Sequence, residues 1–345
     1  MVRLARVSSQ GPGLSRVRQG KGFTYLDPDG RPANDPVVLE RIQALVIPPA
    51  WQDVWICQAV NGHIQATGVD AKGRRQYRYH DAWRLQRDLA KHDRILDFAA
   101  RLPAARQVMG ADLATTGLHR DRVLACAVRL IDLGFFRIGG EKYASENCSY
   151  GLATLRKEHV RLTRAGELEF EYVGKSGKLW QRSLAEPEVC RVVGSLKRRR
   201  SGGPELLAFR QGAGWVDVKS GDINTYLRRA TSGEDTAKDF RTWSATVLAA
   251  VGLAVSTHAQ TPTARTRAVT RVVQEVADKL GNTPAVCRSS YIDPRIIDLY
   301  ADGVVIDLSR LGEGVALGAP AFQGTIEAAV LALLREPATS SRLAG

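Results

Sequence analysis

Residues 72–98 read KGRRQYRYHDAWRLQRDLAKHDRILDF, and within this stretch the chain changes from strand periodicity to helix periodicity. Upstream, over residues 22–79, short alternating segments are separated by turns rich in glycine and proline, which predicts a small β-rich domain. Downstream of Asp81, apolar residues recur at helical spacing. The expected fold class is therefore α+β, with a small β-rich N-terminal domain followed by a mostly α-helical domain.

The junction between these domains is expected near residues 90–104, where Pro103 breaks the helical pattern. We assign residues 1–90 to the β-rich domain and residues 91–345 to the helical domain. In the helical domain, residues 119–133 have one apolar face and stop before Gly134, a natural cap for a helix C-terminus. A small antiparallel sheet is expected at residues 159–162, 168–173 and 179–183, and a closing amphipathic helix at residues 325–335.

The composition is that of a folded, basic protein. The 345 residues correspond to about two domains at roughly 150 residues each. Lysine and arginine number 49 against 36 aspartate and glutamate, which gives a net charge of +13, and 44% of the residues are hydrophobic. This excess of positive charge favours a polyanion as partner.

The chain carries no sequence signal for a membrane or for export. Its longest apolar run, residues 243–255, is well short of the roughly 20 residues of a spanning helix, and the N-terminus lacks the apolar stretch of a secretory signal. The five cysteines are far apart and form no C-x-x-C pair, as expected of reduced thiols. We therefore expect a cytoplasmic protein with no membrane partner, no disulfide framework and no zinc site.

Residues 72–80 combine four basic side chains, an amide and two tyrosines without any acidic residue. Such a set can contact phosphates, sugars and bases. On a strand, Gln76, Arg78 and His80 would face one side and Tyr77 and Tyr79 the other, so part of the motif is expected to be buried. The alternative is a solvated turn with two core tyrosines. The net charge favours contact with a polyanion.

Two glycine-containing motifs place a cation beside flexible backbone. Arg137 follows two phenylalanines and precedes Gly139 and Gly140, a setting in which a guanidinium suits a phosphate. Lys175 lies in Gly-Lys-Ser at an expected hairpin tip, where an ordinary turn lysine is the alternative. A nucleotide-binding loop would need a glycine where Glu169 stands and a helix after the loop, so ATP binding is not supported.

Arg241 and Tyr291 complete the set of candidate site residues. Arg241 lies at the start of the longest apolar stretch, so its side chain either pairs with an internal carboxylate or binds an anion. Tyr291 ends a short helix expected between Pro284 and Pro294. Taken alone, it would be interpreted as a packing residue.

Four motifs together resemble the catalytic motifs of type IB DNA topoisomerases, in particular the poxvirus-like bacterial branch: F-R-I-G-G-E-K-Y (136–143), V-G-K (173–175), K-D-F-R-T-W (238–243) and S-S-Y-I-D-P (289–294). The resemblance runs from about Gly22 to near Leu311, with the motifs in the family's order. It implies a tyrosine-recombinase-like catalytic domain and an ATP-independent isomerase that relaxes supercoiled DNA. It also implies a monomer that acts on double-stranded DNA without a cofactor, in the bacterial cytoplasm and on the nucleoid.

The resemblance assigns a role to each candidate catalytic residue. Tyr291 is the nucleophile, which forms a transient 3′-phosphotyrosyl bond with one strand. Arg137 and Arg241 stabilise the transition state, and Lys175, in a role shared with Arg137, protonates the departing 5′-oxygen. These residue types suit the chemistry, because a phenol with a pKa of about 10 attacks a phosphodiester only amid fixed positive charge. Religation needs no ATP, since the phosphotyrosyl bond retains the ester energy.

Two positions depart from the poxvirus pattern. Asn282 stands nine residues before the tyrosine, where poxvirus members have a catalytic histidine, and Gly140 replaces a base-contacting lysine. Asn282 is expected to act as a neutral hydrogen-bond donor to the phosphate. The resemblance also implies contacts with DNA. They are expected from the strand motif G-R-R-Q-Y-R-Y-H and from the end of the first catalytic motif, through Arg75, Gln76, Tyr77, Tyr79, Lys142 and Tyr143.

A tyrosine recombinase or integrase is the nearest alternative, because it uses a similar arginine, lysine and tyrosine set. Its second arginine usually follows a histidine in H-x-x-R, whereas Asp239 and Phe240 precede Arg241 here, and the β-rich domain is foreign to that group.

A nonenzymatic architectural DNA-binding protein would explain the charge but not the four motifs. A metal-dependent nuclease is disfavoured, since Arg31 follows the Asp-Pro-Asp-Gly turn where a calcium loop needs an oxygen ligand.

Overall fold

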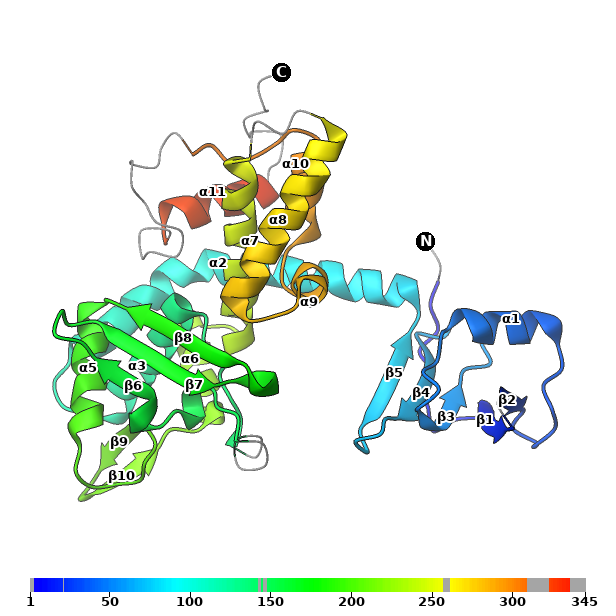
Figure 1. Ribbon diagram of the computed structural model, residues 1–345, viewed down its shortest axis with the longest axis horizontal. Coiled ribbons are helices and arrows are strands. Elements are labelled where there is room, and N and C mark those ends of the chain that lie inside the picture. The colour runs from blue at the N-terminus through cyan, green and yellow to red at the C-terminus, as the bar shows by residue number, and fades with distance from the viewer. Residues whose placement is uncertain are drawn as a thin grey trace. The chain divides into compact units, whose positions relative to one another are not determined.

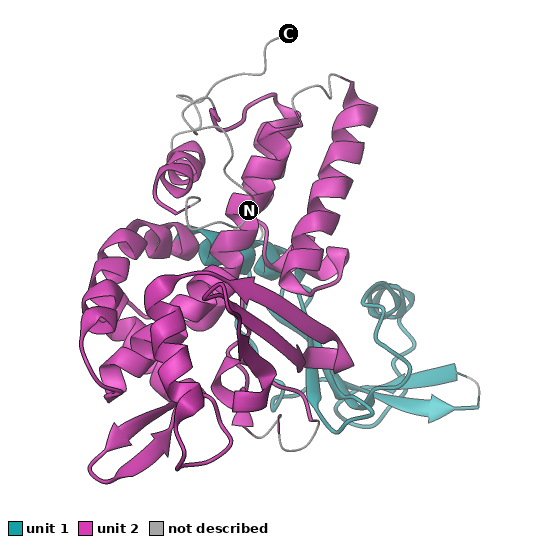
Figure 2. Cartoon of the chain, turned by 60° about the vertical axis from the view of Figure 1, so that its left-hand side comes forward, with its two compact units in different colours: residues 1–93 teal, residues 94–345 magenta. Residues whose placement is uncertain are grey.

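The computed structural model describes residues 3–20, 22–141, 144, 148–256, 261–308 and 323–335. The chain divides into two compact units, residues 1–93 and residues 94–345, which Figure 2 colours separately. The first unit contains an antiparallel sheet and the second is mostly helical, which confirms the predicted α+β fold class. Lys142 and Tyr143, both predicted to contact DNA, lie outside the described residues.

The first unit is built on a five-stranded antiparallel sheet with the strand order β2-β1-β3-β4-β5. Its elements, labelled in Figure 1, are β1 (Leu14–Gln19), β2 (Gly22–Leu26), α1 (Pro36–Ala44), β3 (Gln52–Ile56), β4 (Ile64–Val69), β5 (Arg75–Tyr79) and the beginning of α2 (Asp81–Ala114). The sequence did not indicate α1, which begins where the Asp35 side chain accepts a hydrogen bond from the main-chain N–H of Val37. Ile42 of α1 forms a core with Leu14 and Ile56 of the sheet, and β5 is left at the sheet edge.

Helix α2 continues through Pro103, so the predicted helix break is wrong. Proline removes a main-chain N–H from the helix and usually kinks or ends it. On either side of Pro103, the side chains of Leu102, Ala105 and Met109 are fully buried in the core of the second unit. Burial of this apolar face stabilises the helix enough to outweigh the lost hydrogen bond.

The second unit is arranged around α7, in which almost every residue is buried. Beyond α2, its elements are α3 (Arg120–Gly134), the short 3₁₀ helices η1 (Leu152–Thr154), η2 (Lys157–His159) and η3 (Lys175–Gly177), β6 (Val160–Leu162), β7 (Leu168–Val173), β8 (Leu179–Leu184), α5 (Pro187–Arg198), β9 (Ala208–Gln211), β10 (Gly214–Asp217), α6 (Ser220–Thr231), α7 (Ala237–Ala254), α8 (Pro262–Leu280), α9 (Pro284–Ser290), α10 (Pro294–Ala301) and α11 (Thr325–Arg335). Figure 1 shows α7 and α8 side by side, and α7 also contacts α3, α6, α10 and α11.

The three strands β6, β7 and β8 form the predicted small antiparallel sheet, and α11 has the predicted bounds. The hairpin of β9 and β10 was not predicted. The end of α3 also differs from the prediction, because Gly134 is still helical and Phe135 adopts the left-handed conformation with φ of 57°. A Cβ atom at Gly134 would overlap the ring of Phe136, so packing rather than capping requires this glycine.

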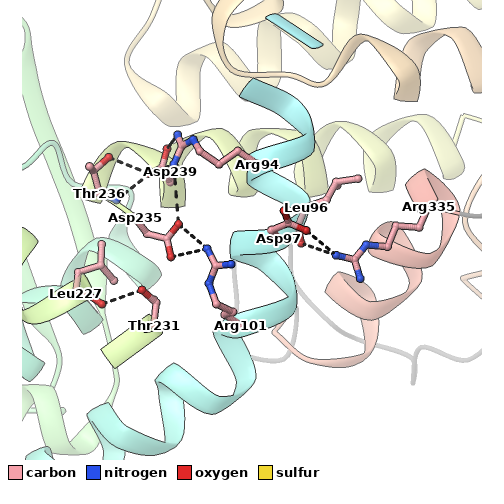
Figure 3. A network of polar contacts seen from close by, with 10 residues as sticks. All are labelled: Arg94, Leu96, Asp97, Arg101, Leu227, Thr231, Asp235, Thr236, Asp239 and Arg335. Atoms are coloured by element: carbon pink, nitrogen blue, oxygen red, sulfur yellow. Dashed lines mark hydrogen bonds and ion pairs between the residues drawn. The ribbon is translucent and has the colours of Figure 1, made fainter. Parts of the chain in front are cut away.

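A network of ion pairs joins α2 to the start of α7 (Figure 3). Arg94 donates hydrogen bonds to both carboxylate oxygens of Asp239, at 3.0 and 2.6 Å. Two turns further along α2, Arg101 donates to both oxygens of Asp235 at 2.9 Å. Both aspartates are buried, so the paired arginines satisfy charges that would be costly alone. The network fixes the first turn of α7, which contains Arg241.

Candidate functional site

Four of the predicted catalytic residues, Arg137, Lys175, Arg241 and Tyr291, line one cavity of about 350 Å³ in the second unit. We call it the tyrosine cavity. Each residue comes from a different element, namely the loop after α3, the tip between β7 and β8, the first turns of α7 and the residue after α9. The fold thus brings together motifs that lie up to 154 positions apart in the sequence.

Both arginines of the tyrosine cavity bind main-chain carbonyl oxygens at the end of α8. Arg241 Nη2 donates to the oxygen of Leu280 at 2.6 Å, and its Nη1 donates to the oxygen of Phe135. Arg137 Nη2 donates to the oxygen of Gly281 at 2.8 Å. A helix C-terminus carries only a partial negative charge, so these contacts orient the guanidinium groups without neutralising them.

The positive charge of the cavity acts on the phenol of Tyr291. The guanidinium carbon of Arg241 lies 5.6 Å from the centre of the tyrosine ring. Burial alone would raise the pKa of Tyr291, but Arg241, Arg137 and Lys238 together outweigh burial and hold this pKa below its ordinary value. Burial, followed by the charge of Arg137, lowers the pKa of Arg241, which as a guanidinium is still protonated at neutral pH.

The tip between β7 and β8 presents Lys175 to the cavity. Its turn needs left-handed backbone at Ser176, with φ of 65°, and at Gly177, with φ of 72°. The buried hydroxyl of Ser149 donates to the carbonyl oxygen of Gly174, and Tyr150 N donates to the oxygen of Val173 at 2.8 Å. The lysine itself is exposed, so the hairpin presents its cationic side chain to solvent. No α-helix follows this turn, as a phosphate-binding nucleotide loop would require.

The glycines after Arg137 bring two main-chain segments into contact. Gly139 has φ of 80°, and a Cβ atom there would lie 2.8 Å from the Cα atom of Gly151. Leu152 N donates to the carbonyl oxygen of Arg137 at 2.8 Å, and Ala153 N donates to the oxygen of Ile138 at 2.8 Å. Gly139 therefore allows its main chain to pack against that of Gly151. This contact holds the backbone of Arg137 in place.

Asn282 lies in a neighbouring cavity of about 320 Å³ rather than in the tyrosine cavity. We call it the tryptophan cavity, because Trp180 of β8 lines it. Asn282 Oδ1 accepts a hydrogen bond from Arg137 Nη2 at 2.5 Å. Its Nδ2 is buried and has no acceptor within the described ranges. Arg137 and Lys175 line both cavities, so the five predicted catalytic residues form one continuous group.

The predicted DNA-contacting residues of β5 belong to the first unit. Tyr77 and Tyr79 are 43% and 39% exposed, which shows that the alternative of two core tyrosines is wrong. Their rings stack at a centroid distance of 5.8 Å. Arg75 is exposed, and Gln76 Nε2 donates to Asp70 Oδ2 at 2.9 Å. The edge strand therefore presents a stacked pair of aromatic rings to solvent.

Several cavity residues were missed by sequence reasoning. Lys238 lies one helical turn before Arg241 and lines the tyrosine cavity with it, a spacing that could have identified it. Tyr172, Trp180 and Arg182 line the tryptophan cavity. Trp180 and Arg182 alternate along β8, so strand periodicity would have placed them on one face. Nothing in the sequence indicated that this face meets the end of α8.

The described residues that line the tyrosine cavity include four cations, Arg137, Lys175, Lys238 and Arg241, and no carboxylate. Within the described ranges, no group of three or more His, Cys, Asp or Glu side chains is placed to hold a metal ion. In the same part of the chain, no helix has the length and apolar character to cross a bilayer.

Comparison with known proteins gives matches over both units. Residues 80–300 match the family described as "Eukaryotic DNA topoisomerase I, catalytic core", and residues 22–70 match "Bacterial DNA topoisomerase IB, N-terminal domain". DNA topoisomerase 1B of Acanthamoeba polyphaga mimivirus is 29% identical over 303 residues, which cover 84% of this chain and 87% of the relative. DNA topoisomerase 1B of Vaccinia virus (strain Copenhagen) is 24% identical over 305 residues, or 84% and 91% of the two chains. DNA topoisomerase 1 of Daucus carota is 31% identical over 129 residues, which cover 37% of this chain and 15% of the relative.

Because the catalytic-core match spans well over half of its length, the chain belongs to the type IB DNA topoisomerases, a family of isomerases, rather than to the tyrosine recombinases.

Proposed function

We propose that this protein relaxes supercoiled DNA by cleaving one strand through a 3′-phosphotyrosyl bond on Tyr291 and resealing it without ATP. The observation that carries this proposal is the tyrosine cavity, in which Tyr291 shares its surroundings with Arg137, Arg241 and Lys175. Since neutral carbonyl groups orient the two arginines, their charge is available to a phosphodiester.

In the proposed cleavage step, Oη of Tyr291 attacks the phosphorus and the bond from phosphorus to the 5′-oxygen breaks. The phenol releases its proton to water, which the lowered pKa of Tyr291 favours. Lys175 donates a proton to the departing 5′-oxygen. Arg137 and Arg241 stabilise the negative charge on the non-bridging oxygens, and Asn282 donates an amide N–H to the same phosphate.

Religation reverses these steps. The 5′-hydroxyl attacks the phosphotyrosyl bond, the phenol of Tyr291 leaves, and Lys175 recovers its proton. Because one ester replaces another in each direction, no external energy source is needed. Between the two steps, the duplex rotates about the intact strand and loses supercoils.

The first unit is proposed to bind the duplex through β5. Arg75 contacts phosphate, whereas Gln76, Tyr77 and Tyr79 contact bases or sugars. The exposure and stacking of the two tyrosines support this role. All catalytic side chains come from one chain, which supports action as a monomer.

The test is relaxation of a supercoiled plasmid in EDTA without ATP, together with mass-spectrometric mapping of the covalent DNA adduct. We expect relaxation by the unmodified protein and an adduct on Tyr291 through a 3′-phosphate. Tyr291→Phe should bind DNA without cleaving it. Tyr300→Phe is the matched control, because the hydroxyl of Tyr300 donates to the carbonyl oxygen of Ser256 and Tyr300 does not line the tyrosine cavity. An adduct on another residue, or relaxation by Tyr291→Phe, would refute the assignment.

A further inference from the structure

The tryptophan cavity extends the proposed active site away from the nucleophile. It shares Arg137 and Lys175 with the tyrosine cavity, but Tyr291 and Arg241 line only the latter. Its own lining comes from the hairpin of β7 and β8, from the end of α8 and from the residues after α8, and includes Trp180, Arg182 and Asn282. A ligand group in this cavity would therefore lie beside the group attacked by Tyr291.

Two side chains of β8 carry buried hydrogen-bond donors that lack acceptors. Neither Nε1 of Trp180 nor Nε of Arg182 has a partner within the described ranges. Buried donors are normally paired, because an unpaired N–H loses its hydration without compensation. Both residues line the same cavity. A ligand bound there would therefore lie beside both side chains that carry these donors.

The surroundings hold these two side chains in fixed positions. The guanidinium carbon of Arg182 lies 4.5 Å from the centre of the Trp180 ring, and Arg182 Nη2 donates to the carbonyl oxygen of Lys279. The Trp180 ring packs against Gly281, where any Cβ atom would overlap it. Fixed donors lose little conformational entropy when a ligand binds. The pair is therefore organised before binding.

The charge of the cavity indicates which ligand it suits. Four cations line it, Arg137, Lys175, Lys178 and Arg182, against the single carboxylate of Asp278. That carboxylate already accepts a hydrogen bond from Gln274 Nε2 at 2.8 Å. An anion that carries acceptors and no donors matches this lining, and a phosphodiester has this chemistry.

We propose that Trp180 and Arg182 form a second phosphate subsite, which binds the DNA phosphate next to the scissile phosphate on the same strand. The proposal rests on the proposed function, since it assigns the neighbouring phosphate of the same substrate. Arg137 lines both cavities and donates a hydrogen bond to Asn282 of the tryptophan cavity, so this pair connects the two subsites. Binding of the second phosphate fixes the register of the strand relative to Tyr291.

The test uses DNA substrates that each carry one neutral methylphosphonate at a position flanking the cleavage site. Formation of the covalent adduct is measured in single-turnover experiments for the unmodified protein, Trp180→Phe and Arg182→Gln. Arg191→Gln is the control, because Arg191 is an exposed arginine of α5 that pairs with Glu188. We expect one flanking methylphosphonate to slow the unmodified protein and the control by about 10-fold or more, as for loss of a charge-assisted hydrogen bond.

The two β8 variants should cleave unmodified DNA more slowly and be insensitive to that same methylphosphonate. The substitution and the methylphosphonate could instead slow cleavage independently, so that their fold-reductions in rate multiply at every position. In that case, or if both variants cleave at the rate of the unmodified protein, the subsite does not exist. Trp180→Phe removes the N–H but keeps an aromatic ring against Gly281, so it tests the proposal even if Arg182→Gln does not fold. Absence of any Tyr291 adduct in the unmodified protein would instead overturn the proposed function.

Discussion

The guanidinium of Arg241 binds the main-chain carbonyl oxygen of Leu280, with a distance of 2.6 Å between Nη2 and the oxygen. This contact differs from those of Arg94 and Arg101, which are paired with buried carboxylates. An arginine paired with a carboxylate contributes little net charge to its surroundings, whereas one held by a carbonyl keeps its full charge. The protein thus uses arginines for structure near α2 and for electrostatics at the end of α8.

Replacing either arginine of the tyrosine cavity should impair cleavage more than binding. Arg137→Ala and Arg241→Ala each remove a preorganised donor to the transition state, and we expect single-turnover cleavage to slow by about 10²–10³-fold or more. DNA affinity should fall much less, because many other cations contact phosphates. Affinity and cleavage rate are measured on the same DNA duplex, with Arg191→Gln as control. Equal losses in both quantities would show that the arginines serve only to bind DNA.

Removing the charge of Lys238 should raise the pKa of Tyr291. Lys238 is exposed and lines the tyrosine cavity, and its charge is one of those that lower this pKa. In Lys238→Gln, a smaller fraction of the phenol ionises at a given pH, so the rising limb of the cleavage rate should move to higher pH. The phenolate absorbance is measured as a function of pH in Lys238→Gln and in the unmodified protein. For each of the two, the absorbance of the same protein with Tyr291→Phe is subtracted, which leaves the titration of Tyr291.

The matched control for this titration is Lys219→Gln, since Lys219 is an exposed lysine at the start of α6. It should leave the pKa of Tyr291 unchanged. A downward shift of the pKa in Lys238→Gln, or the same shift in both variants, would contradict the direct effect of Lys238 on the phenol.

The exposed tyrosines of β5 should affect DNA binding more than stability. Tyr77→Ala and Tyr79→Ala each remove an exposed ring that stacks only on the other, so the melting temperature should change little. Base or sugar contacts through an aromatic ring contribute roughly 1–3 kcal/mol in other complexes, which predicts a loss in affinity of about 5- to 150-fold. Thermal unfolding and DNA titration at one salt concentration separate the two effects. A large fall in melting temperature with unchanged affinity would assign the rings to the fold.

The elements that sequence periodicity predicted are those whose pattern is complete within one segment. The strands around Gly166 and Gly177 and the helix at Thr325–Arg335 have patterns that a single segment displays completely. Pro103 was misjudged because burial of Leu102 and Ala105, which depends on the whole core, outweighs the local cost of proline. Motif resemblance named the catalytic set, but no pattern could show that Asn282 faces a different cavity from Tyr291. That distinction depends on how the end of α8 meets β8.

Asn282 combines two contacts that substitutions can separate. Its Oδ1 accepts from Arg137, and its buried Nδ2 is the proposed donor to the phosphate. Asn282→Ala removes both and should slow cleavage by about 10–10³-fold. Asn282→Asp keeps an acceptor for Arg137 but has no N–H when ionised, so it should cleave no faster than the alanine variant. If Asn282→Asp instead cleaves at the unmodified rate, the residue only positions Arg137.

Asn282→His should keep substantial activity and acquire a new pH dependence. A neutral imidazole can accept from Arg137 through one nitrogen and donate to the phosphate through the other. Protonation converts the accepting nitrogen into a donor and places a second positive charge beside Arg137, so the rate should fall as the pH drops through the imidazole pKa, near 6.5 when unperturbed. The ratio of variant to parental single-turnover rates from pH 5.5 to 8.5 isolates this effect, because the titration of Tyr291 is common to both proteins. A ratio that is constant across this range would place the imidazole outside the active site, and with it Asn282.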